Sequence, residues 1–115
     1  MPKTPEGAVK SDIRKWLDKR GLWRAGGPRP KVVTGWYYMP VPGGFGVHGI
    51  PDFCGIWRQR PFFIEAKAPG GVQTPNQIKR QEEITAAGGW YLLVEDVAQL
   101  DKFEERVNEK KGDYS

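Results

Sequence analysis

The sequence has little cysteine, little histidine and no long hydrophobic run. Its single cysteine, Cys54, cannot form an internal disulfide bond or a cysteine-based zinc site, and this fits a reducing compartment. No apolar run approaches the roughly 20 residues that a membrane-spanning helix needs. Residues 1–5 also lack the apolar segment of a secretory signal. We therefore expect a cytoplasmic protein with no membrane partner.

The composition is that of a folded domain with a mild excess of positive charge. The 115 residues include five tryptophans, four tyrosines and five phenylalanines, which argues against disorder. A chain of this length forms one domain, residues 1–115, and buries roughly two-thirds of its unfolded surface. The net charge of +4 suits a polyanion such as nucleic acid, although many small proteins without a nucleic-acid role share it.

Hydrophobic periodicity and capping residues predict alternating helices and strands. The predicted helices cover residues 5–20, 75–87 and 97–110, and the predicted strands cover residues 22–24, 32–39, 52–57, 62–67 and 90–94. The continuous apolar run at 90–94 is typical of a strand covered on both faces. A right-handed crossover between the last two strands makes them parallel. We expect an α/β domain with a mixed β-sheet flanked by helices.

Two carboxylates and one lysine fall where a β-hairpin brings them together. A turn at residues 58–61 pairs the flanking strands and places Asp52 near Glu65, and side-chain alternation places Glu65 and Lys67 on one face. Charges in so apolar a strand are costly to bury unless something compensates them. Mg²⁺ or Mn²⁺ would do so, and the lysine could orient water or offset charge on a phosphate. The pattern indicates phosphodiester cleavage; its simpler interpretation is an exposed Glu-Lys pair and a turn residue.

Three further residues on helices are candidates for the same site. Glu6 lies on the buried stripe of the first helix, either as an acid favoured by the helix dipole or as a carboxylate directed at a metal. Gln77 and Gln81 lie on the side of the second helix that should face the sheet. A capping box with Thr74 accounts for Gln77. Gln81 has no such local role, so we expect it to bond to the site lysine, to water or to phosphate.

Basic residues and one histidine are candidate DNA contacts. His48 follows a proline- and glycine-rich segment, residues 40–49, which is either a plain connector or a loop that approaches a nucleic-acid backbone closely. His48 itself is either structural or a hydrogen-bond donor to phosphate or to a metal-bound water. Lys79 and Arg80 are candidate contacts for DNA phosphates, although solvated charges are the default interpretation.

Three short motifs together resemble the VRR-NUC family of the PD-(D/E)XK nuclease superfamily. They are Gly49-Ile50-Pro51-Asp52, Ile64-Glu65-Ala66-Lys67 and Thr74-Pro75-Asn76-Gln77. The resemblance runs from the first helix to the last strand. It implies a restriction endonuclease-like core of order αβββαβ, followed here by a C-terminal helix.

The resemblance also assigns roles. It implies Asp52 and Glu65 as metal-binding carboxylates, Lys67 as the site lysine and the backbone carbonyl of Ala66 as a further metal ligand. Glu6 resembles the first-helix acid that many superfamily members add to the site. Either Gln77 or Gln81 fits the glutamine of the following helix.

The function implied is Mg²⁺- or Mn²⁺-dependent hydrolysis of DNA by an endonuclease without an organic cofactor. Stand-alone viral and bacterial members look like structure-selective enzymes, so we expect branched DNA such as four-way junctions or flaps, in a bacterial cell or phage-infected host. The extra DNA-binding domains of a large eukaryotic relative are absent from these 115 residues. A homodimer would supply two sites and a longer basic track. The alternatives are a non-catalytic DNA-binding subunit or scaffold and, less favoured, a restriction-type enzyme.

Overall fold

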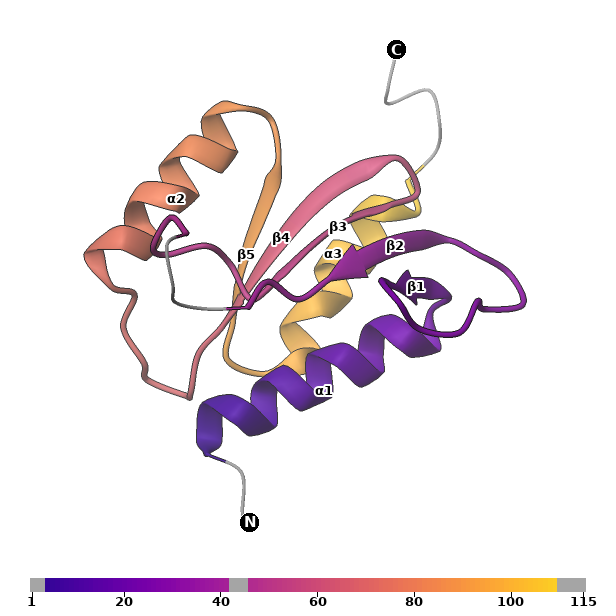
Figure 1. Ribbon diagram of the computed structural model, residues 1–115, viewed down its shortest axis with the longest axis horizontal. Coiled ribbons are helices and arrows are strands. Elements are labelled where there is room, and N and C mark those ends of the chain that lie inside the picture. Colours follow the sequence, from indigo (N-terminus) through magenta and orange to yellow (C-terminus); the bar gives the residue numbers. More distant parts are fainter. Residues whose placement is uncertain (1–3, 42–45, 110–115) are drawn as a thin grey trace.

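Helices and strands alternate in the computed structural model, which describes residues 4–41 and 46–109 (Figure 1). In chain order the elements are α1 (Pro5–Lys19), β1 (Leu22–Arg24), β2 (Gly35–Tyr38), β3 (Phe53–Trp57), β4 (Arg60–Ala66), α2 (Pro75–Ala86), β5 (Trp90–Val94), the 3₁₀ helix η1 (Val97–Leu100) and α3 (Asp101–Val107). Within these ranges, five strands form one mixed sheet in the order β1-β2-β3-β4-β5. The predicted α/β class and mixed sheet are confirmed.

Strand pairing follows from short connections and one crossover. The pairs β2/β3 and β3/β4 are antiparallel, whereas β1/β2 and β4/β5 are parallel. The parallel direction of β4 and β5 agrees with the crossover that α2 makes between them. The β3–β4 turn is tighter than predicted, because Arg58 and Gln59 both adopt positive φ, at 46° and 74°. This two-residue turn leaves Arg60 and Pro61 inside β4.

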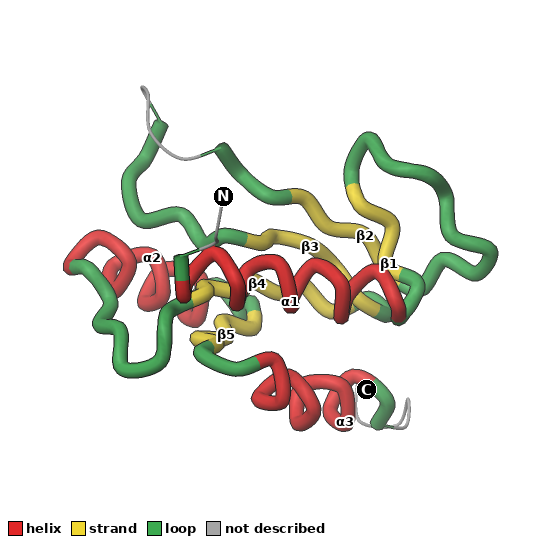
Figure 2. Tube along the Cα trace, turned by 90° about the horizontal axis from the view of Figure 1, so that it is seen from below, coloured by secondary structure: helices red, strands yellow, loops and turns green. Residues whose placement is uncertain are grey.

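One face of the sheet holds the hydrophobic core. The helices α1 and α3 supply apolar side chains to it, and Figure 2 shows α3 on one side of the sheet. Phe103 of α3 makes edge or tilted ring contacts with Trp57, Phe62 and Trp90 at centroid distances of 5.3–5.6 Å. The predicted buried stripe of α1 is confirmed, and consists of Val9, Ile13, Trp16 and Leu17.

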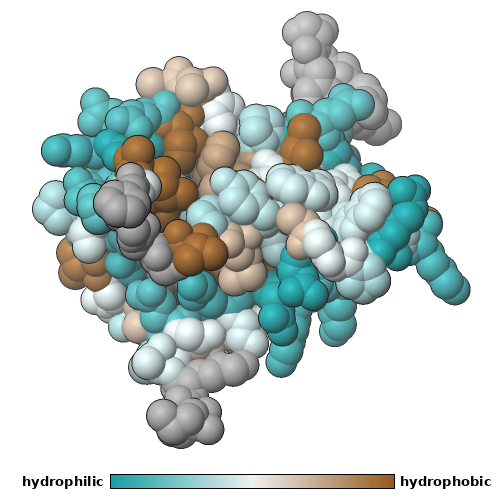
Figure 3. All heavy atoms as spheres, in the orientation of Figure 1, coloured by the Kyte–Doolittle hydropathy of each residue, from teal (hydrophilic) through white to brown (hydrophobic). Residues whose placement is uncertain are grey.

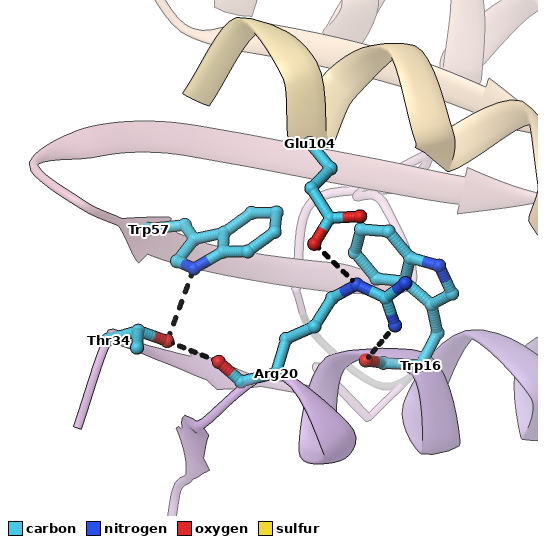
Figure 4. A network of polar contacts seen from close by, with 5 residues as sticks. All are labelled: Trp16, Arg20, Thr34, Trp57 and Glu104. Carbon is cyan, nitrogen blue, oxygen red and sulfur yellow. Dashed lines mark hydrogen bonds and ion pairs between the residues drawn. The ribbon is translucent and has the colours of Figure 1, made fainter. Parts of the chain in front are cut away.

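A polar network at the end of α1 ties both helices to the sheet (Figure 4). The Arg20 guanidinium donates to Glu104 of α3 at 3.0 Å and to the backbone oxygen of Trp16 at 3.2 Å, and it lies 3.7 Å above the Trp16 ring. The backbone oxygen of Arg20 accepts from Thr34, whose hydroxyl oxygen accepts from the Trp57 indole. Arg20 therefore connects α1, α3 and the strand that precedes the hairpin turn.

The opposite face of the sheet is covered less completely than the sequence predicts. Leu93 of β5 is 40% exposed, so the prediction of a strand buried on both faces is wrong. No residue of α2 is fully buried, and Ile78, on the side of the helix that carries Gln77 and Gln81, is 51% exposed. Ile84 does approach the sheet, since it and Phe63 both lie near Gly89. Thus α2 packs on this face mainly through its C-terminal half.

Three predicted boundaries also change. Strand β2 is shorter than residues 32–39, because Val32 and Val33 are exposed and the pairing with β3 begins at Gly35. The last helix begins as the 3₁₀ turn η1, capped by Asp96 and Gln99, and α3 ends at Val107. The predicted end at residue 110 and residues 42–45 of the predicted loop lie outside the described residues. No helix in the described ranges is long and apolar enough to cross a membrane.

Candidate active site

The hairpin gathers the three residues that the sequence singles out. Asp52 immediately precedes β3, Glu65 lies near the end of β4, and Lys67 follows β4 directly. Asp52 Oδ2 accepts a hydrogen bond of 2.8 Å from the backbone N–H of Ala66, the residue between the other two. This bond holds the Asp52 carboxylate beside the strand segment that carries Glu65 and Lys67.

Both charged residues of this segment are buried. Glu65 is 2% exposed and Lys67 is 8% exposed, and within the described ranges these are the buried charged residues. Glu65 Oε2 accepts a hydrogen bond of 3.1 Å from the Gln77 side chain. Its other oxygen, Oε1, is buried without a hydrogen-bond partner in the described part of the chain. A buried carboxylate oxygen without a donor is costly, so this atom marks a place for a proton or a cation.

Electrostatics point to the same conclusion. Burial, followed by the negative charge of nearby Asp52, raises the pKa of Glu65 to about 9, while Lys67 partly offsets the rise. The raised pKa favours a protonated Glu65 beside the ionised Asp52 carboxylate. A divalent cation between them would replace that proton and favour both ionised forms.

Helix α1 adds one acid and one base beside this pair. The charge of Glu6, which is half-buried, contributes to the raised pKa of Glu65, so Glu6 lies within electrostatic range. However, no three His, Cys, Asp or Glu side chains of the described residues are grouped closely enough to hold a metal. Glu6 is therefore not a preassembled third ligand.

Lys10 is the site residue that sequence reasoning missed. A lysine off the apolar stripe of a helix normally faces water, but Nζ of Lys10 lies 3.6 Å from Asp52 Oδ1, and its side chain is only 34% exposed. The i,i+4 spacing from Glu6 places both side chains on one side of α1, and this spacing is the signal that could have found it. In the metal-free protein, Lys10 offsets the charge of Asp52.

The structure distinguishes the two candidate glutamines. The Gln77 side chain accepts from the backbone N–H of Thr74 through Oε1, completing the predicted capping box, and its Nε2 donates to Glu65. One amide thus caps α2 and orients the buried acid. Gln81 instead accepts from Gln73, which also donates to the Tyr91 hydroxyl. The described contacts therefore connect Gln77, and not Gln81, to the acidic pair.

The predicted DNA contacts lie outside this cluster. Arg80 forms an ion pair with Glu83 at 2.9 Å, and its guanidinium donates to the backbone oxygen of His48 at 3.2 Å. His48 and Lys79 are exposed. Arg80 therefore helps to hold the loop before Asp52 against α2.

Gly49 makes the approach of this loop possible. Its φ of +86° is a left-handed conformation, and a Cβ built there would lie 2.4 Å from the backbone carbon of Asn76. Only glycine therefore lets the segment before Asp52 pack against the first turn of α2. Together with the Asp52–Ala66 and Glu65–Gln77 bonds, this contact joins all three motifs named above.

The donor set fits a hard divalent cation. Two carboxylates, one with a buried oxygen lacking a donor, offer the oxygen ligands that Mg²⁺ and Mn²⁺ prefer. The buried ammonium of Lys67 adds positive charge where an anion would bind. No protein-family model matches the chain, and a search of curated proteins finds no significant match.

Proposed function

We propose that the protein is a divalent-metal-dependent DNA nuclease that hydrolyses phosphodiester bonds. The observation that carries the proposal is the buried Glu65 carboxylate, whose Oε1 lacks a donor while Asp52 and Lys67 lie beside it. A buried glutamate with a neighbouring aspartate and a buried lysine is expensive for a fold to keep without a charged ligand. Perturbed titration in such a cluster is typical of functional sites.

In this mechanism Asp52 and Glu65 hold the cation, with Glu6 and the Ala66 carbonyl as further candidate ligands. Bound Mg²⁺ or Mn²⁺ would polarise the phosphate and lower the pKa of an attacking water. The Ala66 N–H and the Gln77 amide fix the two carboxylates before substrate arrives. Lys67 stabilises the negative charge that develops on the phosphate oxygens, and burial strengthens that interaction.

The arrangement of elements supports a restriction endonuclease-like core and the VRR-NUC resemblance. A helix precedes a mixed sheet whose central hairpin carries the acids, and a β4-α2-β5 unit follows. The three motifs that carry the resemblance are separated in sequence but contact one another through Gly49 and Asn76, Asp52 and Ala66, and Glu65 and Gln77. Family membership is part of the proposal, as are a homodimer and selectivity for branched DNA.

Cleavage assays of Asp52→Asn test the mechanism. Wild-type protein should cut DNA with Mg²⁺ or Mn²⁺ and lose this activity in EDTA. Asp52→Asn should cut roughly 100-fold more slowly, because it removes one of the two carboxylates that would hold the cation, and the cation would stabilise the charge of the transition state. Asp12→Asn, at an exposed position on α1, is the matched control and should cut normally. Undiminished metal-dependent cleavage by folded Asp52→Asn would overturn the mechanism.

Substrate choice is tested in the same assay. We expect faster cleavage of a four-way junction or a flap than of linear duplexes. Equal rates on all of them would remove structure selectivity, and cleavage confined to one duplex sequence would favour a restriction-type enzyme instead.

One observation favours a non-catalytic DNA-binding subunit as the second candidate. Lys10 already neutralises Asp52, and a resident ammonium can take the place of a cation in a site that no longer cleaves. This alternative predicts DNA binding without cleavage on junctions, flaps and duplexes with either metal. It also predicts that added Mg²⁺ or Mn²⁺ leaves the melting temperature unchanged, whereas binding of the metal to the acidic site would raise the melting temperature.

A further inference from the structure

The site lies on one face of the sheet, and strand register shows what else lies there. Glu65 shares its face of β4 with Phe63, two residues away. Phe63 is paired with Cys54, and Cys54 with Tyr38, so these side chains form a row across the same face. This row therefore lies roughly 7 Å from Glu65 in the direction of the strands, because Phe63 is two residues away at about 3.3 Å per residue.

The next row on this face is strongly aromatic. Ile56 is paired with Trp36, and Trp36 is paired with Trp23 of β1. This row lies four residues from Glu65, or roughly 13 Å along the strands. We call Trp23, Trp36, Tyr38 and Ile56 the aromatic face.

Helix α2 does not cover the aromatic face. Its contacts with the sheet are at β4 and β5, where Phe63 and Ile84 lie near Gly89. Over β2 and β3, by contrast, Trp36 is 41% exposed, Tyr38 is 42% exposed and Ile56 is 44% exposed. Figures 1 and 3 view the sheet from this side, and in Figure 3 pale colours of intermediate hydropathy fill much of the middle of the face, with brown hydrophobic patches beside them and teal hydrophilic residues at the margin.

The chemistry of the aromatic face suits nucleobases. The rings of Trp36 and Tyr38 lie 5.7 Å apart with an interplanar angle of 36°, so both present area to solvent. The Arg29 guanidinium lies 5.2 Å from the centre of the Trp23 ring. Exposed aromatic rings beside arginine form the platforms on which unpaired bases stack, because every base has a π-face and every nucleotide carries a phosphate.

We propose that the aromatic face binds unpaired nucleotides of single-stranded DNA that continues from the active site. The inference rests on the proposed nuclease function and narrows its substrate class to DNA with a single-stranded segment next to the cleaved bond. Continuity of the two surfaces on one sheet face selects this occupant, since a strand whose phosphate lies at Lys67 can continue along the same face to Tyr38 and Trp36. An apolar protein partner would leave Arg29 without an anionic partner in the complex.

Binding measurements without divalent metal test the proposal independently of cleavage. The probe is fluorescent oligo(dT) in EDTA, compared with a blunt duplex of equal length. Trp36→Ala and Tyr38→Ala should each weaken oligo(dT) binding roughly 10-fold, because each substitution removes one ring on which a base stacks. Duplex binding should change less than about twofold. Trp36→Phe and Tyr38→Phe, which retain a stacking ring, should restore most of the affinity.

Ile56→Ala is the matched control on the same face. Stacking predicts little effect, because isoleucine offers no ring, whereas docking of an apolar protein surface requires Ile56 as well. Equal oligo(dT) affinity for wild-type, Trp36→Ala and Tyr38→Ala would overturn the proposal. Conversion of a wild-type dimer to a monomer by Trp36→Ala would also overturn it, by assigning the face to a second copy.

Failure of this proposal can be told apart from failure of the nuclease function. If the variants bind oligo(dT) normally while wild-type protein cuts DNA and Asp52→Asn does not, only the aromatic face is misassigned. If neither the wild type nor any variant cuts DNA but Trp36→Ala and Tyr38→Ala weaken oligo(dT) binding as expected, base stacking on the aromatic face is supported and the proposed nuclease function is overturned.

Discussion

The two faces of the sheet differ in how they are filled. On the core face, α1 and α3 bury large apolar side chains, and Trp57 is 1% exposed against Trp16 and Phe103. On the opposite face, α2 has no fully buried residue, the buried Glu65 has an oxygen without a hydrogen-bond partner, and Trp36 is 41% exposed. The comparison indicates that stability resides on the first face and ligand binding on the second.

Such a division has a physical basis. A packed apolar face lowers the free energy of the native state in proportion to the area that it removes from water. A binding face must keep polar and aromatic groups available to a ligand, and groups held this way often reduce stability. Substitutions on the binding face should therefore cost less stability than those on the core face, and removal of a group held there at a cost should raise stability.

The largest expected effect is on the core face. Trp57→Ala should lower the free energy of unfolding by about 3–5 kcal/mol, because it removes ring contacts with Trp16 and Phe103 and leaves a cavity. Trp36→Ala is the matched control on the neighbouring strand of the other face and should cost about 1 kcal/mol or less. Urea denaturation measures both. Equal losses would abolish the distinction between the faces.

A smaller change in the free energy of unfolding, of opposite sign, is expected for a substitution of Glu65 on the face opposite the core. Glu65→Gln in EDTA should raise the free energy of unfolding by roughly 1–3 kcal/mol near neutral pH, because the folded wild type must keep Glu65 protonated at a pH where the unfolded chain releases that proton, whereas glutamine is neutral in both states. The neutral amide still offers an oxygen to the Gln77 donor. The same variant should lose cleavage. A destabilised Glu65→Gln protein would show that the ionised acid supports the fold.

The pH dependence of stability sharpens this test. The pKa of Glu65 is raised from 4.5 to about 9 in the folded protein. Between these values the folded protein retains a proton that the unfolded chain has released, so stability falls as pH rises. Wild-type protein in EDTA should therefore be more stable at about pH 5 than at about pH 8, by an amount that Glu65→Gln reduces. Urea titrations at both pH values, with the variant as control, measure this difference.

The smallest expected effect concerns the network that joins the core helices (Figure 4). Arg20→Met should lower the free energy of unfolding by about 1 kcal/mol, because the hydrogen bonds to Glu104 and Trp16 and the cation–π contact are partly exposed. Arg14→Met, at an exposed position on the same helix, should have almost no effect. Thermal unfolding distinguishes the two variants, and equal unfolding midpoints would show that the Arg20 network does not contribute to stability.

Features governed by neighbouring residues could be predicted from sequence. Thr4 and Thr74 cap their helices as expected, since a cap depends on hydrogen bonds within three residues. The hairpin that brings Asp52 to Glu65 follows from alternation and a short turn. The exposure of Leu93 and Ile78 could not be predicted, because it depends on how much of the sheet one helix covers.

The sequence alone thus determined the element types, the mixed sheet and the clustering of Asp52, Glu65 and Lys67, because short-range hydrogen bonds and strand alternation act along the chain. Only the tertiary structure decided that Gln77 contacts Glu65, that Lys10 pairs with Asp52 and that the aromatic face stays open. These features depend on the distances between elements far apart in sequence, which packing sets and which no local pattern encodes.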